Sequence, residues 1–353
     1  MKRLVSAAAA VIMLLSLYGC GRLEDAFNDD TVKMVNYPAS MTDSIGNTVT
    51  LEKPAQRVVV TDYTTLNAAV LLGIGPQIVG YNKDEADGEL IYEMCPELEK
   101  ACDICENGEV STERIIEADP DIVFMPWAQK EIAAELFESG IPVQVFSSAS
   151  EQPTLFSTSL YMISSLTCES STRSTEIGTL QKSILDDLSG YNYKIPFDER
   201  KKVLFLDEHD MCTAAVSGAD KIINLLMEKA GGNNAAETED CGDGSASFDS
   251  KQVKAWNPDV IWVPHFADYA IEDVMESEVF KDTNAVKNGD VYLFPSGLEP
   301  WYENTAAACL GGCWALYNLY PEVYSFKNLK STIETYYKTV YGKNCDLNAL
   351  GIE

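Results

Sequence analysis

The chain lacks the short motifs by which many enzyme active sites can be recognised. It contains no Gly-x-Ser-x-Gly, no His-Glu-x-x-His, no phosphate-binding loop, and no Gly-x-Gly-x-x-Gly after a strand-like segment. Histidine is scarce, with 2 residues in 353, which disfavours a histidine-rich metal site. Acidic pairs such as Glu208 and Asp210 remain for acid–base chemistry, but loop carboxylates are usually solvated. The sequence therefore predicts a protein that is not an enzyme and holds no resident cofactor.

Positive charge is also scarce. Lysine and arginine number 26 against 55 aspartate and glutamate residues, which gives a formal net charge of −29. A surface this acidic excludes nucleic acid as the expected partner. It is compatible with a ligand that is cationic or carries a metal.

Long apolar runs are missing beyond the amino terminus. Residues 1–3 are Met-Lys-Arg, residues 4–17 are largely apolar, and Cys20 follows directly after Gly19. A basic start, a short apolar core and a small residue before a break are typical of a secretory signal. We expect residues 1–20 to be a lipoprotein signal with Cys20 lipidated; the alternative is an ordinary signal with a chance cysteine. Residues 21–53 are then a tether and amino-terminal segment, and the mature protein is extracytoplasmic and anchored to the cell membrane.

Two segments of the chain repeat one pattern. Residues 118–126 read ADPDIVFMP and residues 256–264 read WNPDVIWVP, and both pairs of prolines lie 138 positions apart. Each copy has helix-compatible residues, an Asx-Pro-Asp stop, and an apolar run of the kind found in strands buried on both faces of a parallel sheet. We infer that one structural unit is present twice.

A second pair of segments extends the repeat to whole lobes. Residues 57–62 and 202–207 are each a short apolar run that ends in aspartate, and strand and helix patterns alternate after both. This order predicts an α/β fold with two lobes, residues 54–150 and 199–345, each with a mostly parallel central sheet flanked by helices. Between them, residues 151–198 are expected to form one long linker helix over residues 154–190, where Gly178 is the only glycine before Gly190 and proline is absent.

This plan resembles the substrate-binding proteins of iron-siderophore, haem and vitamin B12 ABC importers. The resemblance covers residues 55–340 and rests on the order of several weak motifs. These are residues 57–62, 72–74 (LGI), 78–81 (IVGY), 112–116 (TERII), 120–123 (PDIV), 217–220 (SGAD), 226–233, 286–292 (VKNGDVY), 312–314 (GCW) and 319–322 (LYPE).

The resemblance implies a monomeric receptor with a ligand cleft between rigid lobes. It also implies that the lobes dock on an ABC permease dimer through an acidic residue near the start of each lobe's first helix. Asp220 occupies this docking position in the second lobe. Asn67 occupies it in the first lobe and departs from the acidic pattern.

The candidate ligand site follows from the geometry of parallel sheets. Loops that follow the carboxyl ends of the strands gather along one edge, where ligands of open α/β sheets bind. Both histidines fall in such loops, and neutral imidazole can ligate iron, cobalt or zinc. The aromatic residues offer flat faces for a macrocycle or catecholate. The expected ligand-binding residues are Tyr63, Thr64, Trp127, Gln129, Ser147, His209, His265, Trp301 and Tyr302.

Three ligand classes remain open from sequence. The leading one is an iron complex (siderophore or haem) or a corrinoid. The alternative is a molybdate or tungstate oxyanion held by hydroxyls such as Thr64 and Ser147 and by backbone N–H groups. Bare zinc or manganese is third, because such sites normally use more histidine.

The chain has nine cysteines besides Cys20. Cys95, Cys102 and Cys105 lie close in sequence, but no fourth ligand completes a metal site. We expect structural thiols or a local disulfide there. Cys309 and Cys313 are four positions apart in an apolar stretch and should be small core residues on one helix face.

Overall fold

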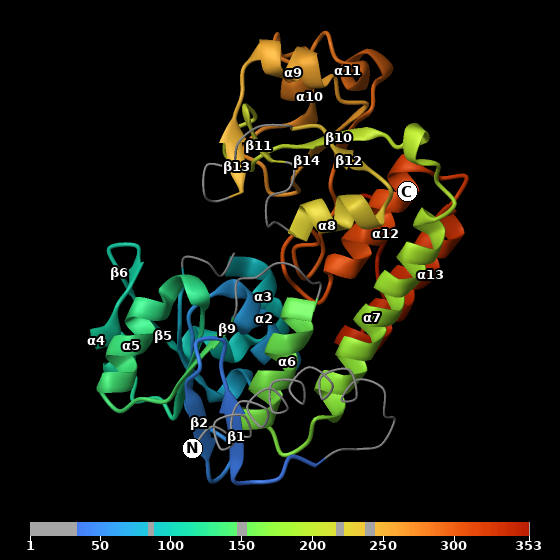
Figure 1. The fold of residues 1–353 in the computed structure, drawn as a ribbon. Coiled ribbons are helices and arrows are strands. Elements are labelled where there is room, and N and C mark those ends of the chain that lie inside the picture. Colours follow the sequence, from blue (N-terminus) through green and yellow to red (C-terminus); the bar gives the residue numbers. More distant parts are fainter. Residues whose placement is uncertain (1–33, 84–87, 147–153, 217–221, 237–243, 353) are drawn as a thin grey trace, which may run out of the picture.

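The computed structural model describes residues 34–83, 88–146, 154–216, 222–236 and 244–352 (Figure 1). Two lobes, each built on a parallel sheet with helices around it, lie one above the other, which confirms the predicted fold class. The predicted signal, Cys20, Ser147 and Asp220 lie outside the described residues. In the described part of the chain, no helix combines the length and the apolar character needed to cross a lipid bilayer.

The amino-terminal lobe is organised around a five-stranded parallel sheet. Val58, Val59 and Val60 in its central strand have no exposed surface, because helices cover both faces. In spatial order the strands are β5 (Cys102–Asp103), β4 (Ile78–Tyr81), β3 (Val58–Val60), β8 (Ile122–Pro126) and β9 (Val143–Phe146). The helices are α2 (Tyr63–Leu71), α3 (Gly88–Met94), α4 (Thr112–Glu117) and α5 (Lys130–Glu138), with short turns η1 (Gly75–Gln77), η2 (Pro96–Lys100) and η3 (Trp127–Gln129). Two hairpins, β1 (Ala39–Thr42) with β2 (Thr48–Leu51) and β6 (Cys105–Glu106) with β7 (Glu109–Val110), complete the lobe.

The carboxy-terminal lobe repeats this topology with four parallel strands. In spatial order they are β12 (Asn233–Asn234), β10 (Lys202–Phe205), β14 (Val260–Val263) and β15 (Val291–Leu293). In both lobes the first strand in the chain (β3 or β10) lies between the second (β4 or β12) and the strand of the repeated motif (β8 or β14), and the next strand (β9 or β15) lies beyond that one. Strand β5 is an additional edge strand of the amino-terminal lobe. The remaining elements are the antiparallel pair of β11 (Thr213–Ala215) and β13 (Ser245–Ser247), η4 (Phe197–Glu199), α8 (Ile222–Lys229), α9 (Ser250–Trp256), α10 (Ile271–Glu276) and α11 (Asn284–Asn288). The predicted duplication is therefore present in the order of the strands.

The Asx-Pro-Asp motif has the same structural role in both lobes: it ends a helix and binds the start of the first strand. Asp119 and Asn257 end helices α4 and α9 in the left-handed region, at φ 48° and 46°, a conformation that Asn and Asp tolerate better than most residues. Two positions later, the carboxylates of Asp121 and Asp259 each accept a backbone N–H from the start of their lobe's first strand, at 3.0 Å in both cases. The motif thus joins a helix end to the sheet.

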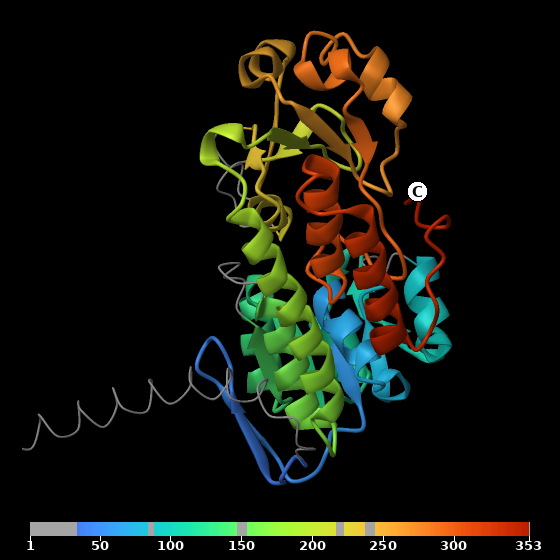
Figure 2. The ribbon, with the colours of Figure 1, turned by 90° about the vertical axis from the view of Figure 1, so that its right-hand side faces the viewer.

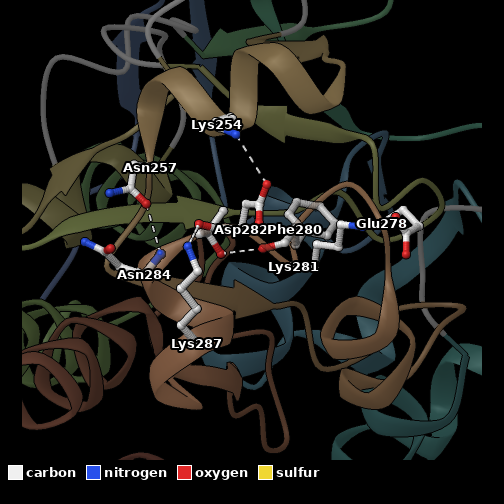
Figure 3. Close-up of polar contacts among 9 residues, drawn as sticks. Lys254, Asn257, Glu278, Phe280, Lys281, Asp282, Asn284 and Lys287 are labelled. Carbon is white, nitrogen blue, oxygen red and sulfur yellow. Dashed lines mark hydrogen bonds and ion pairs between the residues drawn. The ribbon is translucent and has the colours of Figure 1, made fainter.

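Asn257 has a further role in the second copy. Its side-chain oxygen accepts the backbone N–H of Asn284 at 2.9 Å (Figure 3). The Asn284 amide donates to Asp259 at 2.9 Å. These two bonds hold the start of α11 against the end of α9. The nearby Lys254–Asp282 and Lys281–Glu278 pairs are exposed (Figure 3) and contribute little to stability.

The prediction of a single linker helix is wrong. The segment forms two helices, α6 (Thr154–Thr167) and α7 (Thr172–Asn192), separated at residues 168–171. The break is held from a distance, because the Glu169 carbonyl accepts the N–H of Val35 at 3.0 Å and Met34 forms a β-bridge with Ser170. Helix α6 packs on α2 within the amino-terminal lobe, whereas α7 runs along the side of the molecule between the lobes (Figure 2).

Three carboxy-terminal elements lie beside α7: α12 (Ala308–Leu319), α13 (Phe326–Tyr336) and the π-helical turn η5 (Tyr337–Tyr341) (Figure 2). Helix α12 is buried along most of its length and packs against α7, α8 and α13. Its two central glycines permit this packing. A Cβ on Gly311 would lie 2.2 Å from the carbonyl oxygen of Trp301, and one on Gly312 would lie 2.7 Å from Leu188.

Candidate functional site

The amino-terminal lobe brings several predicted site residues together at the carboxyl ends of its strands. Thr61 follows β3 and donates its hydroxyl to the side-chain oxygen of Gln129, which follows β8, at 2.5 Å. Tyr63 and Thr64 are half-buried in the first turn of α2. The preceding Asp62 accepts a hydrogen bond from the Thr65 hydroxyl. Burial raises the pKa of the Asp62 carboxyl above its usual value, although this hydrogen bond opposes the rise.

Trp127 lies at the same rim and is 41 % exposed. The ammonium group of Lys130 stands 3.5 Å from the centre of the Trp127 ring, in a cation–π contact. One face of the ring is therefore occupied by a cation. The amino-terminal rim therefore presents the Trp127–Lys130 pair, next to hydroxyl and amide groups.

Two aromatic residues predicted to face the ligand are instead core residues. Trp301 has no exposed surface and Tyr302 is 4 % exposed, so the prediction that they offer flat faces to a ligand is wrong. The Tyr302 ring packs against Phe205 and Phe294, with centroids 5.5 and 5.8 Å away. Its hydroxyl donates to a carboxylate oxygen of Glu208 at 2.6 Å. Burial, reinforced by this bond, raises the pKa of Tyr302 well above its usual value.

The two histidines differ in their surroundings. His209 is exposed, and its Nδ1 lies 2.9 Å from a carboxylate oxygen of Asp268, which raises the pKa of His209. His265 is partly buried beside Phe266, and its Nδ1 is buried without a hydrogen-bond partner. Burial lowers the pKa of His265, so this imidazole is neutral at pH 7. Among the described residues, no group of three His, Cys, Asp or Glu side chains is placed to hold a metal ion.

A buried polar cluster that sequence reasoning missed connects the lobes. Glu299, in the segment between β15 and α12, accepts hydrogen bonds from the hydroxyls of Tyr336, at 3.1 Å, and Tyr341. Asn67 on α2 lies next to it from the amino-terminal lobe. We call these four residues the lobe junction. The sequence feature that could have indicated this cluster is a single acidic residue, Glu299, in the otherwise uncharged stretch of residues 297–301.

The position of Asn67 contradicts its predicted role. Asn67 was expected to dock on a permease, but it has no exposed surface. It therefore cannot contact a partner in this arrangement of the lobes. Its side chain lies beside Glu299 of the carboxy-terminal lobe instead.

The described cysteines are free thiols. Cys95, Cys102 and Cys105 form no local disulfide, and the structure places them as ordinary thiols, two of them buried. Cys309 and Cys313 are buried on α12, which confirms them as core residues. Burial raises the pKa of Cys313 to about 12, so it stays protonated.

Comparison with known proteins gives one family match. Residues 58–298 match the sequence profile of the family described as periplasmic binding protein. The chain is 26 % identical to the molybdate-binding protein MolA of Haemophilus influenzae over 325 residues, which cover 85 % of this chain and 90 % of that protein.

Solved structures share the fold. The molybdate-bound structure of MolA superposes with a TM-score of 0.75 at 22 % identity, covering 87 % of this chain and 99 % of that one. A periplasmic solute-binding protein from Veillonella parvula gives a TM-score of 0.74 at 21 % identity, with 91 % and 97 % covered. The TroA-like protein FepB from the same species gives 0.69 at 19 % identity, with 88 % and 98 % covered.

Proposed function

The chain belongs to the periplasmic binding protein family, and we propose that its ligand is an iron complex or a corrinoid. As a family member it is an extracytoplasmic substrate-binding protein of an ABC importer, and it delivers a small ligand to a permease without chemical change. The expectation that it is a receptor of the siderophore and vitamin B12 type is confirmed at the level of the family.

The observation that favours a metal complex is the state of His265. A neutral imidazole at the end of a parallel strand can ligate iron or cobalt. The loops of the carboxy-terminal rim, residues 206–212 and 264–270, contain four carboxylates and no lysine or arginine. Such a rim repels a free dianion but not a complex in which the metal has neutralised the ligand's charge.

Native mass spectrometry with elemental analysis for Fe, Co, Mo, W and Zn tests this proposal on the purified protein. Titrations of ferric siderophores, haem and cobalamin should then quench tryptophan fluorescence in a saturable manner. We expect His265→Gln to weaken binding at least tenfold. His209→Gln should weaken it less, because the His209 ring is exposed and already paired with Asp268. Failure of every metal complex to bind would refute the proposal.

The second candidate is molybdate or tungstate, which the similarity to MolA favours. The Thr64 hydroxyl, the Gln129 amide and the Lys130 ammonium supply donors suited to a small oxyanion. The same titrations with molybdate and tungstate separate the two candidates. Saturable binding that Lys130→Gln weakens and His265→Gln does not would establish the oxyanion function.

Lipid anchoring and permease docking complete the proposal. Cys20 would carry the lipid and Asp220 would contact the permease. Replacement of Cys20 by serine should release the protein from the membrane fraction, and its retention there would contradict the anchor. Asp220→Asn should reduce uptake in cells while leaving ligand affinity unchanged, which a binding assay on purified protein checks.

A further inference from the structure

The lobe junction contains a carboxyl group with an incomplete set of hydrogen bonds. One oxygen of Glu299, Oε1, accepts from Tyr336 and Tyr341, which lie where α13 passes into η5. The other oxygen, Oε2, is buried and has no hydrogen-bond partner. A buried polar atom in this condition costs about 1–3 kcal/mol, so its retention at a contact between lobes calls for an explanation.

The Asn67 amide, which neighbours Glu299 from the opposite lobe, also lacks hydrogen-bond partners. Asn67 lies close enough to Glu299 to influence its ionisation, yet neither atom of its amide meets hydrogen-bond geometry. Both side chains have no exposed surface. Two neighbouring groups, one from each lobe, therefore have hydrogen-bonding atoms without partners.

No positive charge balances the carboxyl group in the described structure. The titratable side chains that face Glu299 are Tyr336 and Tyr341, Tyr337 beside them, and Cys309 on α12. Burial raises the pKa of Glu299 above its usual value, although Tyr341, Tyr336, the Asn67 amide and the Ala307 backbone N–H, which favour the carboxylate, lower it in part. The pKa values of Tyr336 and Tyr341 are also raised, so both hydroxyls remain donors.

We propose that protonated Glu299 is a positioning residue that fastens the two lobes together by donating a hydrogen bond from Oε2 to the side-chain oxygen of Asn67. This contact orients both halves of the candidate site. Asn67 lies one helical turn after Tyr63 on α2, and Glu299 lies three residues before Tyr302, which bonds Glu208. The inference concerns the lobes without ligand and does not depend on which ligand binds.

Ionisation of Glu299 then weakens this contact between the lobes. Loss of the proton removes the donor on Oε2 and leaves a buried anion that only neutral donors, the two tyrosine hydroxyls and the Asn67 amide, can face. A buried charge with no facing cation favours entry of water and separation of the lobes. The folded form binds the proton more tightly than the unfolded chain, so the contribution is complete below the ordinary pKa of glutamate, about 4.3. It is lost as the pH rises through the raised pKa.

The Glu299→Gln variant tests this mechanism, because its amide donates and accepts as the protonated acid does but cannot ionise. Without ligand, its melting temperature should equal that of the wild type at about pH 4 and exceed it by a few degrees at about pH 8. Small-angle scattering should show a radius of gyration that increases with pH in the wild type and not in the variant. Glu303→Gln, the same change at an exposed position four residues away, should behave as the wild type.

Parallel pH profiles for the wild type and Glu299→Gln would overturn the proposal. If Glu299→Gln fails to fold, infrared spectroscopy of the wild type decides the question. A carbonyl band from a buried protonated carboxyl group at neutral pH supports the proposal, and its absence overturns it. Neither result bears on the ligand, so failure here is distinguishable from failure of the proposed function.

Discussion

Replacement of Gly311 by alanine should expose how closely helix α12 supports the segment of residues 294–307. The new Cβ would lie 2.2 Å from the backbone oxygen of Trp301 and 3.2 Å from the Phe294 ring. Because the first neighbour is backbone, the oxygen would have to retreat by roughly 1 Å, and overpacking of this kind costs about 1–3 kcal/mol. Alanine gains up to about 1 kcal/mol of helix propensity over glycine, so the clash should win.

Gly190→Ala is the matched control. Gly190 also lies inside a helix, α7, but a Cβ there meets nothing within 4 Å. Only the propensity gain remains, so this variant should be stabilised by up to about 1 kcal/mol.

Thermal unfolding followed by circular dichroism compares the two variants. For a chain of this size, 1 kcal/mol corresponds to about 2 °C, so Gly311→Ala should melt several degrees below Gly190→Ala. Because Tyr302 follows the displaced carbonyl, its bond to Glu208 should also weaken. A Gly311→Ala protein that melts at or above the temperature of Gly190→Ala would refute the packing argument.

Three further changes test local features of the fold. Since burial lowers the pKa of His265, wild-type stability should fall as the pH drops below about 6.5, and urea unfolding at two pH values should show that His265→Gln avoids this loss. Asn257→Ala should cost about 1–3 kcal/mol in the same assay, because it loses the bond from Asn284 and because alanine tolerates φ 46° less well than asparagine. Asn257→Gly should cost less, since glycine adopts this φ without strain, and the reverse order would contradict the argument. Tyr302→Phe keeps the ring among Phe205 and Phe294 but removes the donor to Glu208, so a loss of about 1 kcal/mol is expected, and an unchanged urea midpoint would show that the bond adds nothing.

The sequence predicted the fold correctly where a few neighbouring residues must all be of a particular type for the sheets to form. The repeated Asx-Pro-Asp motif predicted two sheets of the same plan, because the proline, the left-handed Asx and the strand-capping aspartate are all required within a few residues. Strands buried on both faces must be apolar throughout, which made β8 and β14 recognisable. The loops after them held Gln129 and His265 at the rims as expected.

The features that sequence reasoning missed depend on contacts between distant residues. Nothing in residues 168–171 forbids a helix, and the break there is held by Val35 and Met34, more than 130 positions earlier. The aromatic character of Trp301 suited a ligand surface as well as a core. The close approach of its backbone carbonyl to α12 depends on the absence of a side chain at Gly311, which a linear pattern does not reveal.

The shared way in which both lobes attach a helix end to the first strand has a consequence for divergence after duplication. The amino ends of the two sheets are held by equivalent aspartates, Asp121 and Asp259, and these contacts do not involve residues at the opposite edge, where the candidate site lies. Substitutions at the mouth can therefore accumulate independently in each copy, and the corresponding positions 127 and 265 have become tryptophan in one and histidine in the other. Ligand specificity can therefore change through one lobe at a time, while the helix–strand contacts that hold both sheets stay the same.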